Sequence, residues 1–410
     1  MLKRKTTIIA LVLTALCAVS CHESDQTTPS DEGTQWLIGF RASVEESATR
    51  DVGDGELTTA LLKNRGFGVY CWYTGSADFT TPKPASARTG STQPYLMLMR
   101  NQKVTWDGTD AAWDYSPVKY WPQDPTEKLT FRAYAPYTDY LLTDATTGMP
   151  QLPVMVTKDD YHNGVQHDPL WGTGRSVADA KYGEHYNDVT YATSSHRTTP
   201  DATADNTTDG YIHWYFHHGM AKLVFKAKLA DEAPDERIKI TAIKLEPLYT
   251  RGLLDLSSPS TSASDKPIWT DFNGTNEDMK GADALTLTLD TDSPSNSDLY
   301  NVFVAKTAGV AEVVDVTKQG LLIIPRTYTA ASPLVITVYY QREGDVTIYE
   351  AQANLSEIAK NPPQADPRAF YGNTAYTITL NINPVTKNFT ITINVNLFWQ
   401  VGSYKLIDEL

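Results

Sequence analysis

A strand-like run lies near the start of the chain: Trp36-Leu37-Ile38-Gly39-Phe40-Arg41-Ala42-Ser43-Val44. Its apolar side chains recur at every second position, which is the period of a strand with one buried face. Residues 45–55 follow and are charged, small and glycine-containing, as in an exposed connector that proteases reach. Arg50 lies at the middle of this connector. A strand tethered in this way can be removed after folding, and its loss would open an unpaired groove that another chain could fill.

The length and composition of the chain predict a β-rich globular protein. Its 410 residues allow two or three domains at about 150 residues each. Hydrophobic residues make up 41% of the chain and charged residues 20%, which indicates packed cores rather than disorder. Tyrosine is the main aromatic residue, with 23 copies, as is common in proteins built from strands.

The first 21 residues have the three parts of an export signal. Basic residues 3–5 precede an apolar stretch over residues 8–18, and Ala18-Val19-Ser20-Cys21 forms the processing site. This order resembles a bacterial lipoprotein signal, although Ala18 stands where leucine is more usual. We therefore expect a signal peptide over residues 1–20, a lipid on Cys21 and a flexible polar tether over residues 21–35. The alternative is an ordinary cleaved signal peptide in which Cys21 has no role.

Without residues 1–20 the chain is strongly acidic. Their removal takes away three basic residues and no acidic one, which leaves 32 basic and 49 acidic residues and a formal charge of −17. Nucleic acid is therefore not expected as a partner. Cys21 and Cys71 remain, and a lipid on Cys21 would leave no pair for an intramolecular disulfide. No later apolar run reaches the ~18 residues of a membrane-spanning helix.

Short β-type runs separated by turn-rich segments continue from residue 36 onward. The best helical candidate, Glu56–Lys63, is only about two turns long. The series predicts an all-β fold of two consecutive β-sandwiches, an N-terminal one over residues 36–215 and a C-terminal one over residues 216–410. Residues 159–209 are poor in aliphatic side chains, as in an elaborated surface region or the approach to a domain boundary. The expected strands are Gly66–Tyr73, Leu129–Tyr134, Ala221–Ala227, Leu285–Leu289, Pro333–Tyr340, Val346–Ala351, Tyr376–Ile382 and Phe389–Leu397.

No motif in the chain indicates an enzyme or a cofactor. Phosphate loops, His-Glu-x-x-His, Gly-x-Ser-x-Gly and paired Cys-x-x-Cys motifs are absent from the sequence. On a strand His213 and His217 would lie ~13 Å apart and His218 would face the other way, so we expect structural histidines rather than a metal site. The acidic loop over residues 290–298 lacks the glycine and the terminal glutamate of a calcium loop, so a solvated loop is expected.

Five aromatic residues could form a stacking platform for sugars if they were exposed: Trp106, Trp113, Tyr115, Tyr120 and Trp121. Burial in the core is the favoured interpretation, because large aromatic side chains usually pack inside β-sandwiches.

Several stretches together resemble the fimbrillin family of Bacteroidia, the subunits of outer-membrane-anchored pili. Each motif alone is weak, but their order and spacing are fairly specific. The motifs are Tyr115-Ser116-Pro117-Val118-Lys119-Tyr120-Trp121-Pro122, Leu129-Thr130-Phe131-Arg132-Ala133-Tyr134-Ala135-Pro136-Tyr137, Phe216-His217-His218-Gly219-Met220-Ala221-Lys222-Leu223, Leu321-Leu322-Ile323-Ile324-Pro325 and Tyr371-Gly372-Asn373-Thr374-Ala375-Tyr376.

The resemblance implies two consecutive transthyretin-like β-sandwich domains and export as a lipoprotein carrying its lipid at Cys21. It further implies that an arginine-specific protease removes the first strand, here by cutting between Arg50 and Asp51. Asp51 departs from the small residue expected after the cut, and an acidic residue there would slow proteolysis. Polymerisation would follow, with a C-terminal strand of one subunit filling the groove of another.

The candidate donor is residues 389–406. Phe389, Ile391, Ile393, Val395 and Leu397 alternate as the first strand does, and residues 398–406 are an alternative or additional donor. Residues 389–397 could instead be the last strand of their own domain, because residues 383–388 turn the chain into a hairpin with residues 376–382. Burial of Trp36, Ile38, Phe40 and Val44 amounts to ~6–12 kcal/mol as an upper estimate, so the first strand could hardly be lost without a replacement.

The leading hypothesis is a structural pilus subunit at the cell outer membrane, exposed on the surface as part of a fimbrium and contributing to adhesion. Its expected partners are other pilus subunits, an arginine-specific protease, the outer membrane through the lipid anchor, and a host protein or glycan. The alternative is a monomeric surface lipoprotein that binds glycans or host proteins without polymerisation. Neither hypothesis includes an enzyme or a cofactor.

Overall fold

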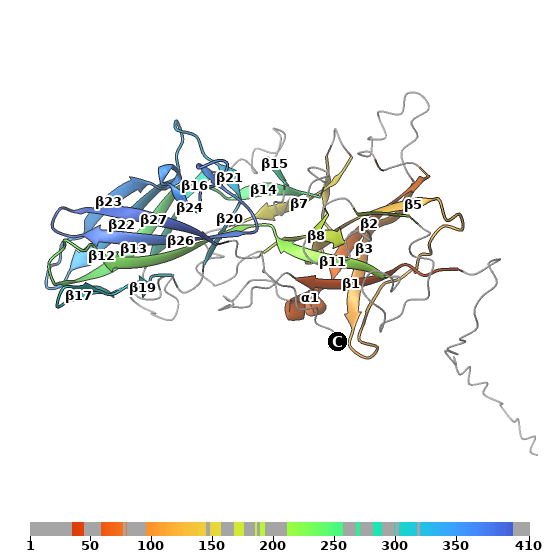
Figure 1. Ribbon diagram of the computed structural model, residues 1–410, viewed down its shortest axis with the longest axis horizontal. Coiled ribbons are helices and arrows are strands. Elements are labelled where there is room, and N and C mark those ends of the chain that lie inside the picture. The colour runs from red at the N-terminus through yellow and green to blue at the C-terminus, as the bar shows by residue number, and fades with distance from the viewer. Residues whose placement is uncertain are drawn as a thin grey trace, which may run out of the picture. The chain divides into compact units, whose positions relative to one another are not determined.

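The computed structural model describes residues 35–44, 59–76, 79, 96–144, 148–156, 168–175, 185–186, 189–192, 211–256, 268–270, 282–288, 299, 303–317 and 320–396. Strands dominate this part of the chain (Figure 1), and the single α-helix found there is α1 (Thr59–Arg65), which buries Leu62. The all-β class predicted from the sequence is confirmed, with sheets in two regions of the chain. Within the described residues, no helix has both the length and the apolar character needed to cross a membrane.

The first region is a nine-stranded sheet with the order β10-β5-β2-β3-β4-β1-β11-β8-β9. A further pairing of β5 with β8, through Tyr134 and Trp171, joins the two arms of this path into a closed circuit. The strands are β1 (Gly39–Val44), β2 (Phe67–Gly75), β3 (Leu96–Asp107), β4 (Ala112–Asp114), β5 (Lys128–Ala135), β8 (Leu170–Arg175), β9 (His185–Tyr186), β10 (Val189–Ala192) and β11 (Tyr211–His218).

Large aromatic side chains fill the core of the first region. Alternate residues of β1, β2, β5 and β11 face this core, as the pleat of a strand requires. Side chains from β1, β2, β4, β5 and β11 meet there, among them Phe40, Phe67, Trp113, Phe131 and Trp214. The core therefore depends on strands that are distant from one another in sequence.

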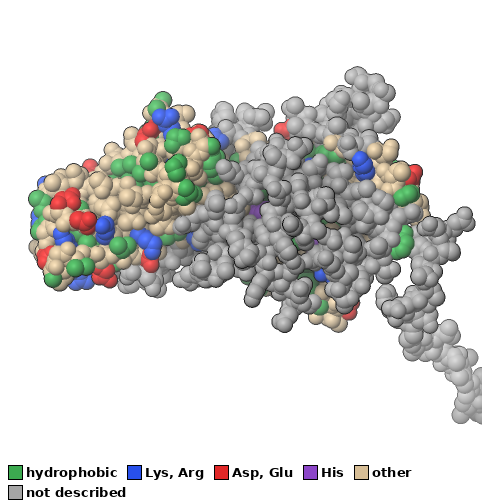
Figure 2. All heavy atoms as spheres, viewed as in Figure 1, with side chains coloured by type: hydrophobic (Ala, Val, Ile, Leu, Met, Phe, Trp, Pro, Cys, Tyr) green, Lys and Arg blue, Asp and Glu red, His purple; other side chains and the backbone are tan. Residues whose placement is uncertain are grey.

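The second region is a β-sandwich of two six-stranded sheets. Buried side chains of both sheets, such as Phe225 of β12 and Ile240 of β13, belong to one core. On the face drawn in Figure 2, the coloured residues of this second region show acidic, basic and apolar side chains interspersed with one another. The first sheet contains β12 (Ala221–Leu229), β19 (Val314–Asp315), β20 (Leu321–Ile323), β24 (Lys360–Asn361), β26 (Thr374–Asn383) and β27 (Asn388–Asn396). The second contains β13 (Arg237–Tyr249), β16 (Ala282–Thr288), β17 (Phe303–Thr307), β18 (Val310–Ala311), β22 (Val335–Arg342) and β23 (Tyr349–Asn354).

A four-stranded sheet is built from both halves of the chain, because β7 pairs with β14. It consists of β6 (Leu142–Thr143), β7 (Pro150–Met155), β14 (Arg251–Asp255) and β15 (Ile268–Thr270). Tyr215, the last residue of the predicted N-terminal domain, lies inside β11, while the next strand, β12, belongs to the sandwich. The predicted division at Tyr215 thus stays a prediction.

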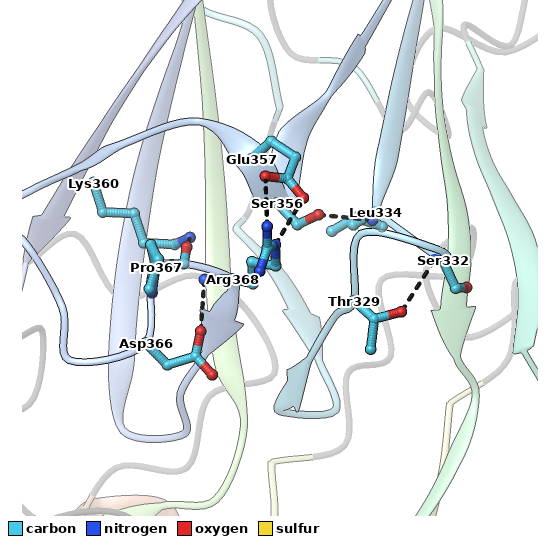
Figure 3. A network of polar contacts seen from close by, with 9 residues as sticks. All are labelled: Thr329, Ser332, Leu334, Ser356, Glu357, Lys360, Asp366, Pro367 and Arg368. Atoms are coloured by element: carbon cyan, nitrogen blue, oxygen red, sulfur yellow. Dashed lines mark hydrogen bonds and ion pairs between the residues drawn. The ribbon is translucent and has the colours of Figure 1, made fainter.

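A polar network holds the segment that covers the outer edge of β27 (Figure 3). This segment includes a 3-10 turn (Leu355–Glu357) and ends at β25 (Ala369–Phe370), which pairs with β21 (Arg326–Thr327). Arg368 Nε donates a hydrogen bond to Glu357 Oε1 over 2.7 Å, and the Lys360 ammonium donates to the carbonyl oxygen of Pro367. Through β24 the segment pairs with Ile393 and Asn394, so β27 has partners on both edges.

Candidate functional site

The candidate site is the slot that β1 occupies in the nine-stranded sheet. β1 pairs in parallel with β11 over its whole length, from Gly39 opposite Tyr211 to Val44 opposite Phe216. On its other side Phe40 pairs with Trp113 of β4. Figure 1 shows β1 lying along β11. The strand predicted over residues 36–44 is therefore an interior strand, and it begins three residues later than expected.

Residues 36–38 continue the slot without being part of β1. Ile38 N donates to the carbonyl oxygen of Lys119 over 2.9 Å, and Trp121 N donates to that of Trp36 over 2.8 Å. Between these bonds, Leu37 and Tyr120 form an isolated antiparallel bridge. The motif at residues 115–122, which carries part of the family resemblance, thus has a structural role as the wall beside residues 36–38.

The apolar side of the strand enters a pocket of aromatic rings. Ile38, Phe40 and Val44 are almost fully buried. The Phe40 ring lies 5.4 Å from that of Tyr115, between centroids, and 6.2 and 6.3 Å from those of Phe67 and Phe131. These distances are typical of favourable aromatic contacts. Phe40 is therefore the side chain that fills the slot at its centre.

Tyr115 bonds the backbone of the strand from within the core. Its hydroxyl donates to the carbonyl oxygen of Ile38 over 2.8 Å, at a buried site. Burial raises the pKa of the Tyr115 phenol above its ordinary value, so the hydroxyl keeps the proton that it donates. The strand is thus recognised through its backbone as well as its side chains.

The other side of the strand is covered by Tyr211. A Cβ atom built on Gly39 would lie 2.7 and 2.8 Å from ring atoms Cδ1 and Cε1 of Tyr211, closer than real contacts allow. The guanidinium carbon of Arg41 lies 4.9 Å from the centre of the same ring. At the end of the strand, Val44 N donates to Thr59 Oγ1 over 3.0 Å. The slot therefore distinguishes positions: large side chains inward, and glycine beneath Tyr211.

Burial of the strand is a large part of the stability of this region. Three almost fully buried side chains contribute about 1.5–3 kcal/mol each, or about 4–9 kcal/mol as an upper estimate. Trp36 is only partly buried. The burial energy of ~6–12 kcal/mol expected from the sequence, which counted Trp36 as fully buried, is therefore too high. A domain whose net stability is about 5–15 kcal/mol would lose most of it with this strand.

The candidate donor at residues 389–397 lies largely in β27 and forms the predicted hairpin. β27 pairs with β26 from Asn388 to Asn396. Ile391, Ile393 and Val395 face the sandwich core, Phe389 packs partly against it, and Leu397 lies outside the described residues. In this structure the segment is the last strand of its own sandwich, which is the alternative that the sequence left open. Donation by residues 389–406 stays a prediction.

Other predicted residues lie outside the described part of the chain. They are Cys21, Arg50 and Asp51, the connector over residues 45–55, the acidic loop over residues 290–298, and residues 398–406.

Two of the three histidines noted in the sequence are buried, and the third, His213, is half-buried. His217 and His218 are fully buried, and His218 Nδ1 lies 2.6 Å from Asp168 Oδ2. Asn373 Nδ2 lies 3.4 Å from His217 Nδ1. Within the described ranges, no cluster of three or more His, Cys, Asp or Glu side chains suits a metal ion. The sequence did not predict Asp168 as the partner of His218, because the two residues are fifty positions apart and no local pattern connects them.

The five aromatic residues considered for sugar stacking are mostly core residues. Trp113, Tyr115 and Trp121 are buried, Trp106 is partly buried against Trp113, and only Tyr120 is exposed. The preference for a buried interpretation is therefore correct for three of the five. A flat platform of exposed rings does not form from these residues.

The family model described as Fimbrillin-like matches residues 49–397, most of the chain. The chain belongs to the Fimbrillin-like family. The match begins after β1 and ends one residue beyond β27.

Two individual proteins are similar to this Fimbrillin-like chain. Fimbrium subunit Fim1C of Phocaeicola vulgatus is 26% identical over 263 residues, which cover 62% of this chain and 61% of that protein. The match thus spans less than two-thirds of the relative. A crystal structure of a fimbrial protein from Bacteroides vulgatus aligns with 18% identity and a TM-score of 0.48, over 90% of this chain and 100% of that one.

Proposed function

We propose that this Fimbrillin-like chain is a structural subunit of an outer-membrane-anchored fimbrium that contributes to adhesion. It is exported as a lipoprotein through Cys21, cut between Arg50 and Asp51 by an arginine-specific protease, and polymerised by strand exchange. Its partners in this scheme are other pilus subunits, the protease, the outer membrane and, at the surface, a host protein or glycan.

The position of β1 is the observation that carries the proposal. An edge strand could leave a sheet with modest consequences, but β1 has neighbours on both sides and fills a pocket of rings. Its removal would leave unpaired backbone groups on β11 and an open apolar slot, which a strand of another subunit would satisfy. The name of the relative, a fimbrium subunit, agrees with such an assembly.

The connector that follows β1 supports proteolytic maturation. Residues 45–55 are polar and glycine-containing, and Arg50 is the only basic residue among them. A cut there would leave β1 held only by non-covalent contacts. The strand could then be exchanged, whereas an uncut strand would compete at a very high effective concentration.

The experiment compares Arg50→Ala with Arg65→Ala, an exposed arginine at the end of α1 that serves as the matched control. N-terminal sequencing of protein recovered from the cell surface should find Asp51 first in the wild type and in Arg65→Ala. Arg50→Ala should remain uncut and monomeric. Processing of Arg50→Ala at the same position would exclude the assigned site.

Membrane attachment is tested separately with Cys21→Ala. The variant should lose fatty-acid labelling and leave the membrane fraction, because a single processed cysteine carries the expected anchor. Membrane partitioning with continued labelling would mean that the lipid lies elsewhere.

The alternative function, a monomeric glycan-binding lipoprotein, receives less support. It requires clustered exposed rings, whereas Trp113, Tyr115 and Trp121 lie in the core. Protein that carries residues 36–44 on the cell surface and never forms polymers would favour this alternative.

A further inference from the structure

Four connecting segments meet at one end of the β-sandwich. We call them the sandwich tip, and they are residues 230–236 after β12, residues 308–313 after β17, residues 343–348 after β22 and residues 384–387 after β26. The first segment binds the second, because Gly309 N donates to Asp235 Oδ1 over 3.0 Å. It also binds the residue before the third, because Arg342 Nε donates to Glu236 Oε2 over 2.9 Å. Segments that are distant in sequence therefore form one surface.

The fourth segment lies beside the third and has a fixed backbone. The Lys387 ammonium lies 4.9 Å from the ring centre of Tyr349, which directly follows the third segment. At the start of the fourth segment, Asn383 Oδ1 accepts hydrogen bonds from Val385 N over 3.1 Å and from Thr386 N over 3.2 Å. A side-chain oxygen that binds the backbone in this way stabilises a turn, so the position of Val385 is fixed.

An aspartate fixes the third segment. The Tyr349 hydroxyl donates to Asp345 Oδ2 over 2.7 Å, and Thr347 N donates to Asp345 Oδ1 over 2.8 Å. Both hydrogen bonds stabilise the charged carboxylate, and they lower the pKa of Asp345 to about 2. Val346 lies within this turn, and its side chain is 91% exposed. The turn thus holds an aliphatic side chain in water beside a fixed negative charge.

The segments after β17, β22 and β26 all present aliphatic side chains to solvent. The exposed fraction is between 54% and 91% for five of them: Val310, Val313, Val346, Ile348 and Val385. Single exposed aliphatic residues are common on protein surfaces, but a group of them on one surface is typical of an interaction site. Because hydrogen bonds already fix the turns that carry Val346 and Val385, little conformational freedom is left to lose on binding.

The sandwich tip has a net negative charge. Its segments contain one basic residue, Lys387, and seven acidic residues: Asp231, Glu232, Asp235, Glu236, Glu312, Glu343 and Asp345. Basic residues at the strand ends form ion pairs with three of these: Lys228–Asp231, Arg342–Glu236 and Arg237–Glu343. Within the described part of the chain, no ion pair includes the other four acidic residues. The sandwich tip therefore combines exposed aliphatic side chains with an excess of carboxylates.

This combination distinguishes between kinds of partner. The same surface of a second copy has the same negative charge, and an anionic membrane surface is also negative, so both would be repelled. A segment of lysine or arginine and aliphatic residues would be attracted by the carboxylates and would cover the valines. Since the whole chain has a formal charge of −14, we expect such a basic segment on another protein.

We propose that the sandwich tip is a docking surface for a basic polypeptide segment, rich in aliphatic side chains, that belongs to a different protein. Aliphatic contacts supply the affinity, and the carboxylates speed association and select the charge of the partner. The inference names a partner class for the adhesive role proposed above, on which it rests. It requires neither cleavage nor polymerisation, because every residue of the sandwich tip is already in place in the uncut monomer.

Binding of three defined peptides to the uncut monomer tests the inference. The first peptide alternates lysine with leucine, the second lysine with serine, and the third glutamate with leucine, all at the same length. Fluorescence anisotropy measures each affinity. The lysine–leucine peptide should bind about tenfold more tightly than either of the others, because it alone offers both features. Equal affinities, or no binding of the lysine–leucine peptide, would overturn the inference.

Paired valine substitutions locate the bound peptide. The double variant Val346→Ser with Val385→Ser removes aliphatic contacts and should weaken binding of the lysine–leucine peptide about tenfold. The matched control is Val118→Ser, which alters an exposed valine of the first region and should leave the affinity unchanged. A double variant that binds as tightly as the wild type would overturn the inference.

Paired carboxylate substitutions test the role of charge. The double variant Glu232→Gln with Glu312→Gln should weaken binding of the lysine–leucine peptide and reduce its dependence on salt. Asp110→Asn, in the turn between β3 and β4, is the matched control and should change neither. All these side chains are exposed, so the variants should fold, and circular dichroism checks that they do. Unchanged affinity and salt dependence in the double variant would contradict the selection of a basic partner.

Two further measurements on the monomer detect the other occupants. Binding to phosphatidylglycerol vesicles that depends on Val346 and Val385 would assign the surface to a membrane, and self-association that depends on them, in sedimentation experiments, would assign it to a second copy. Either result overturns the proposed partner. Cut chains that polymerise normally while no peptide binds the monomer would overturn this inference alone. Failure of processing at Arg50 would instead contradict the proposed maturation and leave peptide binding unaffected.

Discussion

β1 and β27 look alike in sequence but are held in the molecule in different ways. Both come from nine-residue runs with apolar side chains at alternate positions. β27 pairs with the strand that directly precedes it, since Ile382 and Phe389 are joined by a short turn. β1 pairs with β11, and Gly39 lies 172 residues before its partner Tyr211. One strand belongs to a hairpin, and the other has only distant partners.

This difference favours β1 over β27 as the strand that the proposed exchange would replace. A hairpin strand re-forms its ladder because its partner stays close along the chain. β1 would have no such local tether after the proposed cut at Arg50, although its slot would remain specific. An exchangeable strand needs a selective site and a connection that can be cut, and the proposed cut would give β1 both.

The largest expected effect comes from removing each segment completely. A chain that begins at Asp51 lacks β1 and should lose about 4–9 kcal/mol in the first region. A chain that ends at Asn396 keeps β27 and should keep both regions folded. Hydrogen exchange of β11 and β26 amides measures the two cases. Full protection of β11 in monomers of the chain without β1 would contradict the stabilising role of the slot.

Single substitutions in β1 and in β27 should differ in whether their effect on stability persists after cleavage. Before cleavage, Phe40→Ala should lower the free energy of unfolding by about 3–5 kcal/mol and Ile393→Ala by about 2–5 kcal/mol, because both side chains are buried. After cleavage and assembly, Phe40→Ala should have no effect, whereas Ile393→Ala should keep its effect. Urea denaturation of the uncut monomer and of the polymer distinguishes them. A persistent Phe40→Ala effect in polymers would mean that β1 is retained.

The contrast between the local pairing of β27 and the distant pairing of β1 explains which features could be predicted from the sequence. Alternation over residues 376–397 predicted β26 and β27 correctly, because both strands and their turn are local features. Alternation over residues 36–44 also indicated a strand with an inward apolar face. Nothing in the sequence, however, indicated that its neighbours would be β11 and β4, because pairing over such distances depends on the topology of the whole sheet.

Individual residues of the slot were unpredictable for the same reason. Gly39 interrupts the strand pattern, and its need for glycine arises only from the ring of Tyr211. Residues 115–122 were noticed as a motif, but not as the wall beside Trp36 and Ile38. The sequence therefore predicted the strand that occupies the slot and the buried face of that strand. It did not predict the residues that line the slot around the strand.

The stabilities of the two regions should respond to alkaline pH in opposite directions. Beside β27, burial lowers the pKa of Lys360 to about 8. Between that value and the ordinary pKa of about 10.4 the unfolded chain binds more protons, so stability from this group rises with pH. In the slot, burial raises the pKa of Tyr115, so its contribution is complete below about pH 10 and is lost at higher pH.

Lys360→Met tests the first of these responses, because it keeps the buried stem and removes the charge. From pH 7 to 9.5 the wild type should gain about 1 kcal/mol on the variant, less than the full shift implies because solvent screens part of the site. Denaturation of both proteins at the two pH values measures the gain. Parallel curves would mean that Lys360 carries an ordinary pKa.

The smallest expected effect concerns two cations that lie over tyrosine rings, one in each region. Arg41 lies 4.9 Å from the ring centre of Tyr211, and the Lys387 ammonium lies 4.9 Å from that of Tyr349 beside the turn between β26 and β27. Exposed contacts of this kind contribute about 0.5–1 kcal/mol. Arg41→Gln and Lys387→Gln should therefore destabilise the uncut monomer by similar, small amounts. In the polymer only Lys387→Gln should still matter, because Arg41 leaves with β1 while Lys387 stays in its hairpin. Equal effects of both variants on the polymer, measured by thermal denaturation, would mean that the slot still holds its original strand.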